Sequence, residues 1–136
     1  MIKPIVRDAF FLNQKSEEAT KVDLPIAQDL EDTLKANREH CVGMAANMIG
    51  YRKNMIIVAT GLADIVMINP KITAKAEPYE TEEGCLSLPG TRKTTRYNKI
   101  TVRYQDKKFE EHTQNFSGYI AQIIQHECDH LQGILI

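Results

Sequence analysis

Two histidines four residues apart, with a glutamate directly after the first, are the strongest chemical signal in this chain. They lie in Gln125-His126-Glu127-Cys128-Asp129-His130. On an α-helix this spacing places both imidazoles on one face, one turn apart, where they can bind one divalent metal. The Glu127 carboxylate can reach a water on that metal without being a ligand, and can move a proton from that water to a leaving group. The competing interpretation is a helix with two surface histidines beside carboxylates.

The sequence around this motif favours the metal interpretation, because it predicts an amphipathic helix with the motif on or near its buried side. The apolar residues of the segment recur at three- and four-residue steps: Ile120, Ile123, Ile124 and Leu131. Ser117 or Gly118 suits the start of this helix, and Gly133 suits the position just past its end.

A catalytic metal site needs a third protein ligand and an open position for water. Cys85, in Glu83-Gly84-Cys85-Leu86-Ser87, is the best candidate, because a thiolate is a strong ligand for zinc and ferrous iron. The remaining histidines and cysteines are weaker candidates, which we expect to be solvated or packing residues: His40, His112, Cys41 and Cys128.

The rest of the chain alternates between one further helix and several strands. Apolar residues spaced by four predict an amphipathic helix over residues 25–39. Strands are predicted over 55–59, 65–68, 72–76, 100–104 and 109–116, with a stop at Asn69-Pro70. Residues 41–50 are small and apolar, which suits either a turn under the core or a close approach to a ligand. Helix, strands and then helix predict an α+β fold of mostly antiparallel β-sheets around the C-terminal metal-binding helix.

The length predicts a single domain over residues 1–136, and the composition is that of an ordinary globular protein. Of the residues, 43% are apolar and 26% are charged, and the net charge is −1, which gives no basic footprint for nucleic acid or an anionic membrane. The first eight residues lack the apolar region of a signal peptide, and no apolar run has membrane-spanning length. The three cysteines make no disulfide framework, so we expect a reducing, cytoplasmic location.

Three segments together resemble the peptide deformylase family. They are Gly43-Met44-Ala45-Ala46, the Glu-Gly-Cys-Leu-Ser run from Glu83 to Ser87, and Gln-His-Glu-x-x-His from Gln125 to His130. Their order and spacing match as well, and the resemblance extends over nearly the whole chain. It implies a hydrolase that removes the formyl group from the N-terminal formylmethionine of nascent bacterial or organellar polypeptides and releases formate.

The resemblance also implies a role for each residue of these motifs. Cys85, His126 and His130 would hold one divalent metal, Fe²⁺ in many members, with Zn²⁺, Ni²⁺ or Co²⁺ as alternatives. Glu127 would be the general acid/base, and the backbone N–H of Leu86 would help to hold the oxyanion. The partners implied are a formylated nascent peptide and a transient contact with the ribosome, and we expect a monomer.

Further residues are expected around the substrate and behind the ligands. By the resemblance, Gly43 lies against the substrate backbone, and Glu83 and Arg92 brace the site from behind the metal ligands. The methionine side chain needs an apolar pocket, for which the candidate walls are Val42, Gln122 and Ile123.

The chain departs from the family pattern at three places. Met48 stands where the first motif normally ends in glutamine, and methionine has no N–H to give to an oxyanion. Loss of one such donor costs roughly 10²–10³ in rate, and Gln122 is the candidate to replace it. Cys41 stands where glycine is usual, and either narrows the cleft or only packs. Only six residues follow His130, whereas many bacterial members continue into a long C-terminal helix.

Two other functions stay open at this point. Met48 and Cys41 are also consistent with a metal-dependent amidase of the same fold that acts on a different formyl or acyl substrate. A non-catalytic or weakly active relative that binds peptides is the third interpretation, although a pure binding module has no need for Glu127.

Overall fold

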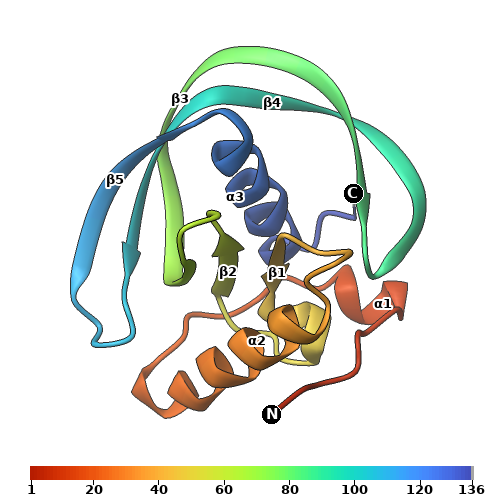
Figure 1. Ribbon diagram of the computed structural model, residues 1–136, viewed down its shortest axis with the longest axis vertical. Coiled ribbons are helices and arrows are strands. Elements are labelled where there is room, and N and C mark those ends of the chain that lie inside the picture. Colours follow the sequence, from red (N-terminus) through yellow and green to blue (C-terminus); the bar gives the residue numbers. More distant parts are fainter. Residues whose placement is uncertain (136) are drawn as a thin grey trace.

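The computed structural model describes residues 1–135, which form an antiparallel sheet wrapped around a C-terminal helix (Figure 1). The five strands lie in the order β1-β2-β3-β4-β5. Their bounds are β1 Gly43–Ala45, β2 Met55–Ala59, β3 Asp64–Cys85, β4 Leu88–Gln105 and β5 Glu111–Ser117. The helices are α1 Ala9–Leu12, α2 Leu24–Ala36 and α3 Gly118–Leu131, with short 3₁₀ turns at η1 Lys21–Asp23 and η2 Ala46–Ile49. The α+β prediction is confirmed. Within residues 1–135, no helix is long and apolar enough to cross a bilayer.

Strand β3 is much longer than the sequence predicted, and the expected stop at Asn69-Pro70 is wrong. The strand continues through these residues because the pairing with β4 shifts its register between Ile68 and Lys71. Such a bulge releases Pro70, which has no N–H to give, from the regular ladder. Asn69 takes a positive φ of 51° and is held there by side-chain hydrogen bonds to both backbone groups of Ala19.

The resulting β3–β4 hairpin carries one part of the functional site. Its two strands arch over α3 in Figure 1 and close through a tight tip, Leu86 and Ser87. Cys85 is the last residue of β3, so the hairpin delivers the cysteine and the tip together.

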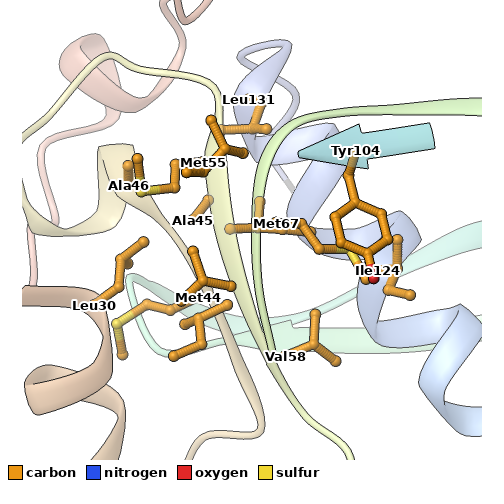
Figure 2. Packing of buried hydrophobic residues seen from close by; sticks show 14 of the residues in the cluster. Leu30, Met44, Ala45, Ala46, Met55, Val58, Met67, Tyr104, Ile124 and Leu131 are labelled. Carbon is orange, nitrogen blue, oxygen red and sulfur yellow. The ribbon is translucent and has the colours of Figure 1, made fainter. Parts of the chain in front are cut away.

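Helix α3 carries the two histidines and lies on the inner side of the sheet. It begins after Ser117 and ends before Gly133, which has a positive φ of 77°, as expected for the residue past a helix end. Its buried face includes Ala121, Ile124 and Leu131. Figure 2 shows Ile124 and Leu131 in the apolar core with Met55, Met67 and Tyr104.

Helix α2 covers the other side of β1 and β2. It is somewhat shorter than the predicted range of 25–39, with Pro25 in its first turn. It buries Ile26, Leu30 and Leu34, and each such side chain contributes about 1.5–3 kcal/mol through removal from water. We therefore assign α2 to the core, as its pattern predicted.

The first 16 residues are tied by backbone hydrogen bonds to segments that directly follow the first and third motifs. The N–H of Val6 donates to the carbonyl of Met48, and the N–H of Ser16 donates to the carbonyl of Leu131, both at 2.8 Å. Between these two contacts, the apolar run Ala9–Leu12 forms the single turn of α1, where Leu12 is buried and Phe10 is exposed.

Candidate metal centre and active site

Three donor atoms converge between the end of β3 and the middle of α3. Cys85 Sγ lies 3.1 Å from His130 Nε2, which lies 3.3 Å from His126 Nε2. All three atoms are within 4.8 Å of one another. Donors at 2.0–2.3 Å from one tetrahedral metal are separated by roughly 3.3–3.8 Å. The cluster therefore fits a single metal ion with two nitrogen ligands and one sulfur ligand.

The two imidazoles differ in their protonation. Burial, together with the nearby His126, lowers the pKa of His130 to about 3, so its ring is neutral and has a lone pair to give. Burial also lowers the pKa of His126, but its hydrogen bonds with Cys85 and Glu83 outweigh this and raise it to about 10. A metal bound here must displace that proton.

Glu83 orients one of these ligands from behind. Its Oε1 lies 2.9 Å from His126 Nδ1, which directs the opposite ring nitrogen toward Cys85 and His130. Burial raises the pKa of Glu83, but hydrogen bonds from His126 and Arg96 lower it to about 2. Glu83 is thus a carboxylate, as a group that accepts the Nδ1–H of a metal ligand must be.

The arginine that pairs with Glu83 is Arg96, and the expected role of Arg92 is wrong. Arg92 lies opposite Glu83 in the β3–β4 ladder, but its side chain is exposed. Arg96 is only 4% exposed, and its guanidinium reaches Glu83 at 2.6–3.1 Å and Asp129 Oδ2 at 2.6 Å. The sequence carried no signal for Arg96, because the pairing depends on how the bulged hairpin packs on α3. The sequence pointed only weakly to Asp129, because this residue lies between His126 and His130 in the motif.

Glu127 is the carboxylate beside the donor cluster, and Gly43 makes room for it. Glu127 is buried, and its Oε1 has no hydrogen-bond partner among residues 1–135. Burial raises its pKa to about 7, which suits a group that accepts and then returns a proton near neutral pH. A Cβ at Gly43 would lie 3.0 Å from Glu127 Oε2 and 2.5 Å from Ile123 Cγ2. A larger residue at this position would therefore displace Ile123 or the Glu127 carboxylate.

A cleft of about 280 Å³ opens onto this centre. Its lining includes all the residues predicted to touch substrate: Val42, Gly43, Leu86, Gln122 and Ile123. The sequence did not predict that His40, Glu82 and Tyr119 also line it. Val42 and Tyr119 are 40% and 63% exposed, so they lie toward the mouth of the cleft.

Cys41 lines the cleft as well, but as a thiol. Its Sγ donates a hydrogen bond to the carbonyl of Gly43 at 2.8 Å. Burial raises the pKa of this thiol to about 12, which makes the thiolate needed for metal binding unfavourable. Cys41 therefore narrows the cleft beside Gly43 and is not a ligand.

Neither Met48 nor Gln122 places a side-chain N–H donor on a reacting oxygen. Met48 is buried in the lining, and its Sδ accepts the N–H of Ala45 at 3.4 Å. Gln122 donates its amide N–H to Glu83 Oε2 at 2.9 Å. This bond places the amide in the network that braces His126, rather than on a reacting oxygen as the sequence suggested.

Comparison with known proteins agrees with this site. The family model for polypeptide deformylase matches residues 2–136. The peptide deformylase of Clostridium beijerinckii is 59% identical over the full length of both chains. Peptide deformylase 2 of Clostridium acetobutylicum is 39% identical, over 91% of this chain and 85% of that protein.

Solved structures show the same fold. A class I type b peptide deformylase from Acinetobacter baumannii, in a crystal structure with Met-Ala-Ser bound, has a TM-score of 0.89 at 29% identity. That alignment covers 99% of this chain and 97% of the other. The peptide deformylase of Thermotoga maritima also scores 0.89, at 30% identity, over 99% of this chain and 95% of that one. The chain therefore belongs to the polypeptide deformylase family of metal-dependent hydrolases.

Proposed function

We propose that this chain hydrolyses the formamide bond of N-terminal formylmethionine in nascent polypeptides and releases formate. The observation that carries the proposal is the position of a buried Glu127 beside the Cys85, His126 and His130 donor cluster in one cleft. Glu127 Oε1 has no hydrogen-bond partner within the described residues 1–135. A binding module needs no such carboxylate, whereas amide hydrolysis needs a group that moves protons. Family membership supports the same activity.

Cys85, His126 and His130 would hold the metal, which is Fe²⁺ in this proposal, although a Cys/His/His donor set also suits Zn²⁺. When bound, the metal supplies Lewis acidity that lowers the pKa of the attacking water. Glu83 keeps the His126 ring in the orientation that this ligand set requires.

The protein's own groups then move the proton and stabilise charge. Glu127 takes a proton from the water, whose oxygen adds to the formyl carbon. The N–H of Leu86 donates a hydrogen bond to the carbonyl oxygen as charge develops there. Glu127 passes its proton to the amine nitrogen, the C–N bond breaks, and formate and the free N-terminus leave.

The cleft accommodates the start of a peptide. Ile123 and Val42 are apolar walls for the methionine side chain, and Gly43 allows the substrate backbone to lie close to Glu127. Val42 and Tyr119 are exposed at the mouth, where the following residues would lie. In this proposal the protein acts as a cytoplasmic monomer that meets the nascent chain through a transient contact with the ribosome.

The test is formate release from formyl-Met-Ala-Ser by anaerobically purified, iron-loaded protein. Glu127→Gln is the matched control, because it keeps the shape of the side chain and removes its proton transfer. Removal of a general acid/base lowers turnover by about 10²–10⁴, so we expect release by the wild type and near-complete loss in the variant at equal metal content. A wild type that carries one metal per chain and releases no formate would refute the proposal.

Met48 favours one alternative, an amidase for another formyl or acyl amide, because the lining lacks a side-chain donor at that place. A panel of formylated and acetylated amides separates the two functions. A higher kcat/KM for a substrate other than formylmethionyl peptides would support the alternative.

A further inference from the structure

Two consecutive residues of the N-terminal segment contact the two segments that flank the donor cluster. The N–H of Val6 donates to the carbonyl of Met48 at 2.8 Å. The Arg7 guanidinium, through Nη1, donates to the carbonyl of Leu86 at 2.8 Å. Figure 1 shows α1, which follows Arg7, beside the end of the β3–β4 hairpin. One short segment thus joins two walls of the cleft.

The residues directly before and after Arg7 in the sequence are both held by hydrogen bonds. Val6 is anchored by its backbone, and the Asp8 carboxylate accepts the N–H of Phe10 at 3.0 Å, which caps α1. The Arg7 side chain itself is exposed and does not belong to the buried core. Its contact with Leu86 is therefore a charge-assisted hydrogen bond and not a packing contact.

Leu86, whose carbonyl accepts the hydrogen bond from Arg7, lies at a position of the hairpin where a small displacement affects catalysis. Leu86 follows the ligand Cys85 directly and belongs to the two-residue tip between the paired residues Cys85 and Leu88. An oxyanion donor must be held at 2.7–3.1 Å from the oxygen that it stabilises. The Met48 thioether has no N–H to share this task. A small rotation of the tip would therefore reduce the rate.

We propose that Arg7 is a positioning residue for the reaction, because its guanidinium fixes the Leu86 carbonyl from outside the cleft and so fixes the orientation of the tip that carries the Leu86 N–H. Arg7 does not line the cleft and is not among the metal donors. Its effect reaches the oxyanion through the tip alone. This inference rests on the proposed function, in which the Leu86 N–H stabilises the developing charge.

The experiment compares steady-state deformylation of formyl-Met-Ala-Ser by wild type, Arg7→Met and Arg7→Lys, each iron-loaded to one metal per chain. Arg7→Met keeps the aliphatic stem and removes the donor, whereas Arg7→Lys keeps a charged donor. Arg103→Met is the matched control, since Arg103 is half-exposed and its ion pair with Glu111 lies on β4 and β5, outside the cleft.

We expect Arg7→Met to lower kcat about three- to tenfold, the range for loss of one orienting hydrogen bond. The KM, melting temperature and metal content should stay at wild-type values, because Arg7 belongs to neither the cleft lining, the core nor the donor cluster. Arg7→Lys should recover part of the rate, and Arg103→Met should match the wild type.

Two results would overturn the inference: an unchanged kcat in Arg7→Met, or a kcat that falls only together with melting temperature and metal content. The second result would make Arg7 an ordinary structural contact. Failure of the proposed function is distinguishable from both, because it would appear as absence of formate release by the wild type.

Discussion

The guanidinium of Arg96 and the carboxylate of Glu83 form a buried ion pair directly behind the donor cluster. Arg96 Nε lies 3.1 and 2.9 Å from the two carboxylate oxygens, and Nη2 lies 2.6 Å from Oε1. The same carboxylate contacts His126 Nδ1. This ion pair therefore couples the packing of the β3–β4 hairpin against α3 to the orientation of the metal ligand His126.

Arg96→Met should destabilise the protein and weaken metal binding together. Removing one partner of a buried pair leaves an uncompensated charge and costs about 3–5 kcal/mol. Arg92→Met is the matched control, because exposed Arg92 is the ladder partner of Glu83 without being its ion-pair partner. Urea unfolding and metal content after dialysis are the measurements. Equal losses in the two variants would contradict the assignment of Arg96.

Gly43→Ala should impair catalysis more than it impairs folding. The added Cβ would meet Ile123 Cγ2 at 2.5 Å and Glu127 Oε2 at 3.0 Å, so the carboxylate must shift. A misplacement of about 1 Å costs roughly 10²-fold in rate, and overpacking costs about 1–3 kcal/mol. Gly84→Ala is the comparison, because its Cβ would meet nothing closer than 3.4 Å. The prediction fails if both variants have the same kcat.

The local parts of this site were predictable from sequence, and the non-local parts were not. His126 and His130 lie on the same face of α3 because residues four apart on a helix always share a face, so their proximity could be predicted from local sequence. Strand β2 was found with its observed bounds because a buried apolar run needs no partner to be recognised. Arg96 was missed because its contact depends on tertiary packing.

Two further features could not be predicted from the local sequence. Pro70 indicates the end of a strand by local rules, but a bulge in the pairing with β4 lets β3 continue. The contact between Arg7 and Leu86 joins residues 79 positions apart, and nothing in the sequence near Arg7 indicates it. Both features arise from how distant segments pack.

Cys85→Ser should abolish metal binding, whereas Cys41→Ser should not. Both residues line the cleft, but only Cys85 Sγ lies within the donor cluster, and the Cys41 thiol is held by the carbonyl of Gly43. A hydroxyl is a far weaker ligand than a thiolate for Zn²⁺ or Fe²⁺. Metal content by elemental analysis, after purification under reducing conditions, measures the difference. Retention of stoichiometric metal by Cys85→Ser would refute this ligand set.

Met48→Gln should raise turnover of formyl-Met-Ala-Ser. The Met48 Sδ accepts the N–H of Ala45, and the glutamine Oε1 can accept the same bond while its Nε2–H points into the cleft. A new oxyanion donor is worth up to about 10²–10³ in kcat, and we expect at least a tenfold gain because the site is already buried. Met48→Leu, which has the same bulk and no donor, is the control and should keep the wild-type rate. If Met48→Gln is no faster than Met48→Leu, then the Leu86 N–H already meets the need of the transition state, and the thioether causes no loss of rate.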